Sequence, residues 1–342
     1  MSHYLSLRYI DDESYEFFEG LNHKVHRNSK ILQEERIPCK TAQDIDFNIK
    51  NIIEEEFVAG KTAILLSGGI DSAILASYLP EGTKAYTMHC VADGAINETA
   101  QAKKYCDYYN LDHSIVDISW EDFEKYTPEI IKDANVPVHS IEILLHKAIL
   151  QAKADGIEYL VVGDSADSTF GGFSKLLSKD WTLFEFMENF VYTKPEKVLK
   201  NPVSMIDIYK KYCNGDFFNT QEYIKDEYAK ESLTSYLHAF EFGNIDYIAP
   251  YTYLKMAEPL DLDKVRSGES KYLLRELFKL KYPHLDIPEK IPMPRATEQW
   301  FKDWEGPKRE EFLPNCVSGL TGDQKWQVYC LELFLNIFDK GE

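Results

Sequence analysis

The first half of the chain alternates short apolar runs with segments in which apolar residues recur at helical spacing. Four runs are expected to be strands: 63–66, 86–91, 111–118 and 159–162. Residues 98–109 and 141–152 are expected to be helices, and Gly156 follows the second of them where a helix would end. Strands that alternate with helices favour right-handed crossovers and a parallel sheet covered on both faces. The pattern predicts a doubly wound α/β fold.

Beyond residue 180 the pattern changes to aromatic-rich segments with few strand-like runs. Helices are expected at 181–192, 204–212, 220–242 and 270–282. We interpret the chain as a lead-in segment over 1–41, an α/β core over 42–180 and a helical portion over 181–342. Within the lead-in, residues 4–9 are expected to form a strand. The helical portion is expected to fold over the carboxyl ends of the core strands.

The first strand runs into a loop that suits a phosphate group. The chain reads Thr62-Ala-Ile-Leu-Leu66-Ser67-Gly68-Gly69-Ile-Asp71-Ser72. Gly68 and Gly69 allow a sharp turn and a close approach to a ligand, and the following helix N-terminus offers unpaired amides. Ser67 and Ser72 add hydroxyl donors, while Asp71 suits a magnesium ion. The alternative is an ordinary glycine turn before a helix that Asp71 or Ser72 caps.

A second apolar run ends in an acidic loop. It reads Tyr159-Leu-Val-Val-Gly163-Asp164-Ser165-Ala166-Asp167-Ser168-Thr169-Phe170-Gly171-Gly172. Ligands of open parallel sheets bind outside the carboxyl ends of the strands. If the two strands are neighbours, Asp71 and Asp167 converge on one metal ion. The alternative is that Asp164 or Asp167 only caps a turn.

These two motifs together resemble a known superfamily. Ser-Gly-Gly-Ile-Asp-Ser resembles the pyrophosphate loop of the N-type ATP pyrophosphatases, also called PP-loop or adenine nucleotide alpha hydrolase-like proteins. The Gly, Ala-Asp and Phe-Gly-Gly elements of the second motif resemble the acidic loop of asparagine synthetase and β-lactam synthetase. The resemblance covers residues 42–310 and implies cleavage of ATP between its α and β phosphates.

The resemblance also implies roles for individual residues. Residues expected to bind ATP and pyrophosphate are Leu66, Ser67, Gly68, Gly69, Asp71, Ser72, Met88 and Gly163. Met88 matches a position in the adenine pocket of relatives, although plain core packing would explain it equally well. Asp71 and Asp167 are implied to hold Mg²⁺. Asp164 lies where relatives carry a glutamate or a tyrosine associated with binding and deprotonating the nucleophile.

Two later segments concern the cations of the site. Lys271-Tyr-Leu-Leu-Arg275-Glu resembles the family's Lys-x-x-Leu-Arg-Glu helix and suits a phosphate, or else forms an ion-paired helix face. The family's Leu-Pro-x-x-Ile-x-x-Arg-x-Lys run corresponds to residues 287–297, where no lysine occupies the expected place. Arg295 is the nearest cation and is expected to take the role of that lysine. Lys290 is expected at the surface.

Composition narrows the classes of partner and location. The net charge of −19 disfavours a general nucleic-acid surface, and no apolar run has the length of a membrane span. The six cysteines show no paired spacing for zinc or a redox couple, which fits a reduced, cytoplasmic protein. The lead-in is too short for a glutaminase domain, and residue 2 is Ser rather than Cys. Nitrogen is therefore expected from ammonia, from a separate glutaminase subunit or from an amine.

The leading hypothesis is an amide ligase. It would adenylate the carboxylate of a small molecule, release pyrophosphate and transfer the acyl group to ammonia or an amine, with Asp164, Lys271 and Arg295 as catalytic residues. One alternative is a sulfur-transfer or nucleobase-modifying enzyme of the same superfamily. The other is a catalytically silent protein that binds a nucleotide.

Overall fold

The computed structural model describes residues 1–10, 14–24, 35–291, 293 and 295–339. Its centre is a five-stranded parallel sheet in the order β4-β3-β2-β5-β8. The strands are β2 (Thr62–Leu65), β3 (Lys84–Cys90), β4 (Asp112–Ile118), β5 (Tyr159–Val161) and β8 (Asp246–Ile248). The strand order reverses between β2 and β5, which is where open α/β sheets place their ligands.

Helices cover both faces of this sheet, as the sequence predicted. Successive strand residues point to opposite faces, so Ile64 packs on one side while Ala63 and Leu65 pack on the other. The first face carries α2 (Ala42–Glu56), α3 (Ile70–Ala76), α4 (Thr99–Tyr109) and α14 (Tyr272–Lys281). The opposite face carries α5 (Trp120–Ala134), α6 (Ser140–Ala154), α12 (Ala229–Gly243) and α16 (Gly322–Phe338). The doubly wound α/β fold is confirmed.

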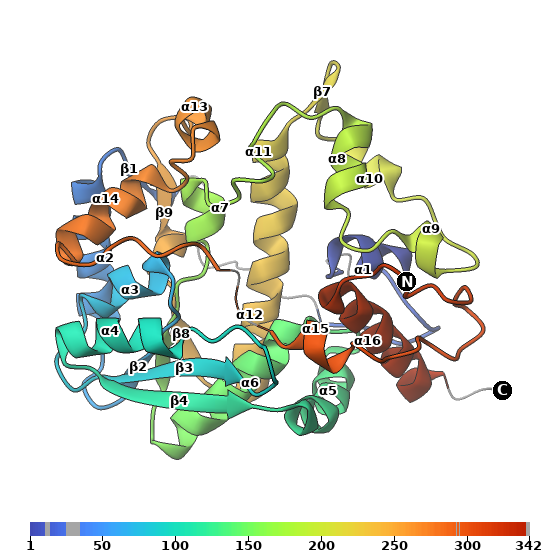
Figure 1. Ribbon diagram of the computed structural model, residues 1–342, viewed down its shortest axis with the longest axis horizontal. Helices are drawn as coiled ribbons and strands as arrows, with labels where there is room; N and C mark the ends of the chain where they lie inside the picture. The colour runs from blue at the N-terminus through green and yellow to red at the C-terminus, as the bar shows by residue number, and fades with distance from the viewer. Residues whose placement is uncertain (11–13, 25–34, 292, 294, 340–342) are drawn as a thin grey trace.

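The later part of the chain adds helices and a strand around this core. Helices lie inside the four ranges expected beyond residue 180, and β8 adds a strand to the sheet that was not expected. The elements are α8 (Leu183–Phe190), α9 (Pro195–Val198), α10 (Ile206–Lys210), β6 (Cys213–Asn214), β7 (Phe217–Phe218), α11 (Thr220–Tyr223), the π-helix η2 (Ile224–Tyr228), the 3₁₀-helix η3 (Pro250–Tyr253), α13 (Leu262–Arg266) and α15 (Thr297–Trp300). Because α11, η2 and α12 follow one another without a break, they form one helical column through the middle of Figure 1.

Two short sheets lie outside the core. β1 (Ile37–Cys39) pairs in parallel with β9 (Leu254–Met256), and β6 pairs antiparallel with β7. Aromatic side chains fill the space beneath α8 and the β6–β7 hairpin, where Phe186 and Phe218 stack with ring centroids 3.9 Å apart. Among the described residues, no helix is long and apolar enough to span a membrane.

The strand expected at residues 4–9 is wrong. Residues 2–7 form the helix α1 (Ser2–Leu7), which ends at Arg8 in the left-handed conformation with φ 64°. Tyr4 and Leu5 pack into the core on the α16 side of the sheet, while Leu7 packs into the aromatic cluster beneath α8. A short apolar run is compatible with either a helix or a strand. Here the helix buries its apolar side chains against two different hydrophobic clusters. In Figure 1, α1 lies beside α16.

Candidate functional site

The loop after β2 is held in shape by its own serines. The Ser67 backbone N–H donates to Ser72 Oγ over 3.0 Å, and the Gly69 N–H donates to Ser67 Oγ over 3.2 Å. No side chain caps α3, which begins after Gly69. A Cβ on Gly68 would lie 3.2 Å from the Cβ of Glu98, so a larger residue would push the loop and α4 apart by a few tenths of an ångström. The result is a preformed loop that leads into a helix N-terminus.

Asp71 and Asp167 meet at the switch point of the sheet. Asp71 lies in the first turn of α3 after β2, and Asp167 lies in α7 (Ala166–Phe170) after β5. The ammonium of Lys271 forms an ion pair with Asp71 and lies 2.7 Å from Asp167 Oδ1. The two carboxylates therefore converge on one cationic group.

Lys290 belongs to the same cluster. Its Nζ lies 2.6 Å from Asp167 Oδ1 and donates to the Gly172 carbonyl over 2.8 Å. Lys290 lies at the surface, as expected, with its side chain 46% exposed, but its ammonium also reaches Asp167. The backbone of this corner is tight as well, since a Cβ on Gly172 would lie 1.7 Å from Asp167 Oδ1.

The electrostatics of the cluster fit a cation between the two aspartates. Burial raises the pKa of Asp71, whereas the charges of Lys271 and Lys290 outweigh burial at Asp167 and lower its pKa. Burial would lower the pKa of Lys271, but the charges of both aspartates keep it raised. Asp71 Oδ1 is buried without a hydrogen-bond partner, as expected of an oxygen that awaits a ligand.

This donor set suits Mg²⁺ bound together with a phosphate rather than a metal site built by protein alone. In the described part of the chain, no group of three or more His, Cys, Asp or Glu side chains could hold a metal ion. Mg²⁺ is usually held by one or two carboxylates and completes its coordination with phosphate oxygens and water. Asp71 and Asp167 supply the two carboxylates.

A cavity of about 230 Å³ opens beside this cluster. The residues expected to bind ATP line it, except Gly68: Leu66, Ser67, Gly69, Asp71, Ser72, Met88 and Gly163. Asp167 and Lys271 line it as well. Gly68 lies behind the loop against α4. Arg275 and Lys290 also line the cavity, so positive charge is concentrated at the side where α14 begins.

A second cavity of about 240 Å³ adjoins the first, and the two share Gly163, Asp167, Tyr236 and Met293. Asp164 and Arg295 line this second cavity. Asp164 Oδ1 accepts a hydrogen bond from Ser232 over 2.8 Å, and burial raises the pKa of Asp164. Arg295 forms a two-pronged ion pair with Asp323, in which Nε donates to Oδ1 over 3.0 Å. Arg295 thus lies in the second cavity and not in the Asp71 and Asp167 cluster.

Sequence reasoning missed several residues that line these cavities. They are Arg8, Glu98, Glu231, Tyr236 and Lys290. Lys290 carried a usable signal, since it lies within the proline-rich run that replaces the family's lysine motif. Arg8, Glu231 and Tyr236 lie in segments without a motif, and only the fold shows that they face the site.

Comparison with known proteins supports the family resemblance of the loops after β2 and β5. The model of the asparagine synthase family matches residues 59–248. A protein of Methanocaldococcus jannaschii assigned as a glutamine-hydrolysing asparagine synthetase is 25% identical over 171 residues, which are 49% of this chain and 31% of that protein. The amidase chry2 of Gibberella zeae is 24% identical over 145 residues, 42% of this chain and 22% of that protein. The chain spans less than a third of the length of these two relatives.

Among solved structures, the ammonia-dependent NAD synthetase of Campylobacter jejuni is similar over a limited part. The match covers 38% of this chain and 60% of that chain, at 18% identity and a TM-score of 0.27.

Replacing Gly172 by alanine should dismantle the charged cluster. The new Cβ would lie 1.7 Å from Asp167 Oδ1 and 2.4 Å from Lys271 Cε, so both side chains must move. We expect magnesium–nucleotide affinity to fall by about tenfold or more, which is ~1.4 kcal/mol. Isothermal titration calorimetry measures this affinity. Gly82→Ala is the control, because it meets no atom within 4 Å although its φ of 75° is strained. Equal loss in both variants would show general destabilisation instead.

Nucleotide affinity should depend on the charge of Glu98. Burial raises the pKa of Glu98 to about 7, and its carboxyl lies against the Gly68 loop. As pH rises from 6 to 8, Glu98 gains a negative charge and should repel phosphate, which weakens affinity by roughly threefold to tenfold. Titrations of an uncleavable ATP analogue with wild type and Glu98→Gln isolate this contribution. The same dependence in both proteins would contradict it.

The free energy of unfolding should also fall as pH rises. A carboxyl whose pKa is raised on folding stabilises the protein below its unfolded pKa and loses that contribution as pH rises to about 7. Glu98→Gln should therefore raise the melting temperature more at pH 8 than at pH 5.

Proposed function

The chain belongs to the asparagine synthase family, and from this premise we propose that it is an ATP-dependent amide ligase that forms AMP and pyrophosphate. The observation that carries the proposal is the pair of adjoining cavities that meet at Gly163 and Asp167. The first suits ATP, because the Ser67–Ser72 loop and a cluster of cations line it. The second suits the carboxylate substrate, whose acyl group would meet the α-phosphate where the cavities join.

In the first step, a carboxylate oxygen would attack the α-phosphate of ATP and the bond to the β-phosphate would break. The loop from Ser67 to Ser72, with its glycine backbone and the hydroxyls of Ser67 and Ser72, would hold the leaving pyrophosphate. Lys271 and Lys290 would offset the charge that develops on the phosphates. Mg²⁺ held by Asp71 and Asp167 would supply further charge neutralisation when bound.

In the second step, ammonia or an amine would attack the acyl carbon and AMP would leave. Asp164 lines the second cavity, and burial raises its pKa, so it is placed to accept a proton from the attacking nitrogen. Arg295 faces the same cavity and would contact the acyl adenylate from that side.

The proposal extends to organisation and partners. Residues 42–180 would form the nucleotide-binding core, and residues 181–342 would complete it, since they supply β8 and Lys271. Ammonia, a separate glutaminase subunit or an amine substrate would provide nitrogen. We place the protein in the cytoplasm, a setting that the acidic composition and the spacing of the cysteines support.

Asp71→Asn should abolish turnover while the fold remains. The substitution keeps the shape of the side chain but removes one of the two charges that converge on Lys271. A screen of carboxylic acids for exchange of labelled pyrophosphate into ATP measures adenylation directly, and we expect a loss on the order of a hundredfold or more. Asp107→Asn, which alters an exposed ion pair with Lys103 on α4, is the control. Release of ADP and orthophosphate by the wild type would overturn the proposal.

Lys290 and Arg295 should affect different parameters. Lys290 lies on the phosphate side, so Lys290→Met should lower kcat for pyrophosphate exchange on the order of a hundredfold. Arg295 lies on the acyl side, so Arg295→Met should mainly raise KM for the acid. Steady-state exchange kinetics separate the two, with Lys103→Met as a surface control. A fall in kcat in Arg295→Met alone would assign the family lysine's role to Arg295.

A further inference from the structure

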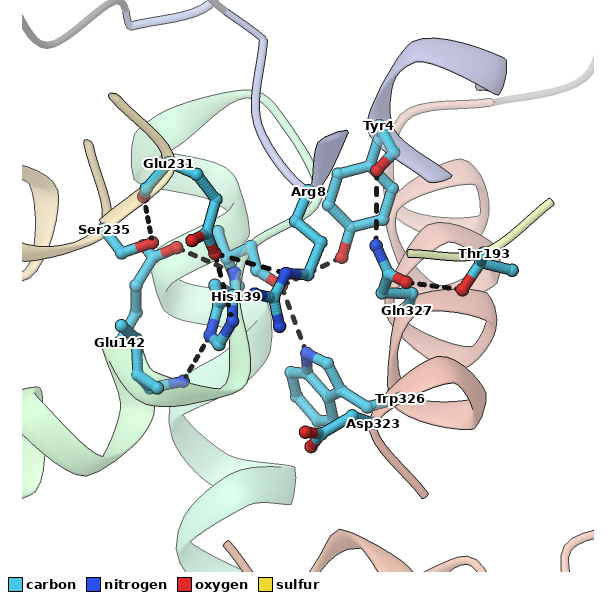
Figure 2. Close-up of polar contacts among 12 residues, drawn as sticks. Tyr4, Arg8, His139, Glu142, Thr193, Glu231, Ser235, Asp323, Trp326 and Gln327 are labelled. Atoms are coloured by element: carbon cyan, nitrogen blue, oxygen red, sulfur yellow. Dashed lines mark hydrogen bonds and ion pairs between the residues drawn. The ribbon is translucent and has the colours of Figure 1, made fainter. Parts of the chain in front are cut away.

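One end of the second cavity is built by residues outside the two motifs. Arg8 reaches it from the end of α1, Glu231 from α12, and His139 from the start of α6, as Figure 2 shows. Arg8 Nε lies 3.2 Å from Glu231 Oε1, and His139 Nε2 lies 3.3 Å from the same oxygen. The guanidinium of Arg8 also lies 3.6 Å from the centre of the Tyr192 ring. Three distant segments thus form one polar corner.

This corner has hydrogen-bonding capacity to spare. Arg8 Nε and Glu231 Oε1 are both buried, and neither makes a hydrogen bond in spite of their ion-pair distance. Glu231 is only 6% exposed. Buried polar atoms are nearly always satisfied, so atoms left open at the wall of a cavity indicate a group that binds there. Arg8 also holds a backbone conformation that is uncommon for a long side chain, as often occurs at functional sites.

Most of the charges at the cavity wall already form ion pairs. Among the described residues that line it, Arg8 pairs with Glu231, Arg295 pairs with Asp323, and Asp167 pairs with two lysines. Asp164 accepts hydrogen bonds from Ser232 and Ser165. A charged group on a substrate would have to compete with these partners at a cost in desolvation.

Uncharged hydroxyl groups fit this wall better. They can donate to Glu231 and accept from Arg8 or His139 without breaking an ion pair. His139 Nδ1 accepts the Ile141 amide over 2.9 Å, so its Nε2 carries the hydrogen that faces the corner. The wall also carries several aromatic rings and hydroxyls, together with a few small or aliphatic residues: Phe173, Tyr192, Tyr228, Tyr236, Ser165, Ser168 and Ser232 supply the rings and hydroxyls. Aromatic faces suit the apolar face of a hydroxylated ring.

We propose that Arg8, His139 and Glu231 recognise an uncharged, hydroxyl-bearing part of the acyl substrate, and that the enzyme therefore adenylates a hydroxylated carboxylate such as a sugar acid in preference to an amino acid. The inference rests on the proposed function, because it identifies the second cavity as the acyl site. It adds one specificity residue, Arg8 at the end of α1, that the family match does not reach.

Binding of two probe acids of opposite character tests the inference. The full chain is saturated with α,β-methylene ATP and magnesium, and D-glucuronate and L-glutamate are titrated in turn by calorimetry. We expect saturable binding of D-glucuronate with an affinity at least tenfold higher than that of L-glutamate. Equal or tighter binding of L-glutamate, or no saturable binding of D-glucuronate, overturns the inference.

Variants locate the recognition. Arg8→Lys keeps the charge and loses the guanidinium plane, and we expect it to weaken D-glucuronate binding at least tenfold while nucleotide affinity stays unchanged. Glu231→Gln should also weaken D-glucuronate binding at least tenfold, and it replaces Arg8→Lys in the test if that variant does not fold. Arg309→Lys is the matched control. Arg309 also forms ion pairs, with Glu311 and Asp339, but it does not line either cavity. Unchanged D-glucuronate affinity in a folded Arg8→Lys or Glu231→Gln protein overturns the assignment.

The same experiments distinguish this inference from the proposed function. A wild-type protein that fails to bind α,β-methylene ATP, or exchanges no pyrophosphate with any acid, overturns the ligase proposal. Pyrophosphate exchange with amino acids but not with hydroxylated acids keeps the ligase proposal and overturns only the inference.

Discussion

The convergence of two buried carboxylates on Lys271 is the interaction on which the site depends. It follows from the pairing of β2 with β5, whose register sets Ile64 opposite Val161 and so brings the two following loops to one edge. Asp71 and Asp167 are close enough to repel each other, and burial increases that repulsion. A lysine that is 5% exposed lies between them, because an uncompensated pair of buried acids would destabilise the fold. The chemistry and the stability of the core therefore share the same atoms.

A sheet of this kind also explains how residues far apart in the chain form one site. The strands fix the two loops, while α12 passes beside them and carries Ser232 and Tyr236 to the place where the cavities join. Tyr251 and Tyr282 donate to backbone carbonyls of Asp71 and Ala73, over 2.9 Å and 2.6 Å, and so fasten α3 from the later part of the chain. Such contacts make the later part a structural support of the first loop and not only its cover.

The core sheet and the loops after β2 and β5 could be predicted from the sequence because their signals are local. Apolar runs that end in glycine and aspartate specify both a buried strand and the loop after it. β8 escaped prediction since three residues carry no clear period, and α1 was misassigned because a short apolar run fits either element. Lys290 lies at the surface as predicted, but its contact with Asp167 depends on the reach of the side chain, which spacing along the chain does not show. Arg8 could not be found without the fold, since its contacts lie more than 180 residues away in the sequence.

The balance of acidic and basic residues around the first cavity determines what the site needs in order to bind a polyphosphate. The chain carries a net charge of −19, which opposes the approach of a polyphosphate. Around the first cavity, however, three cations, Lys271, Lys290 and Arg275, nearly balance the four acids Asp71, Asp167, Glu98 and Glu289. Burial holds Glu98 partly neutral near pH 7, which moves the local balance toward neutrality. A nearly neutral wall cannot by itself offset the charge of ATP, so the oxygen that Asp71 leaves without a hydrogen bond is best explained as a place for a cation that arrives with the nucleotide.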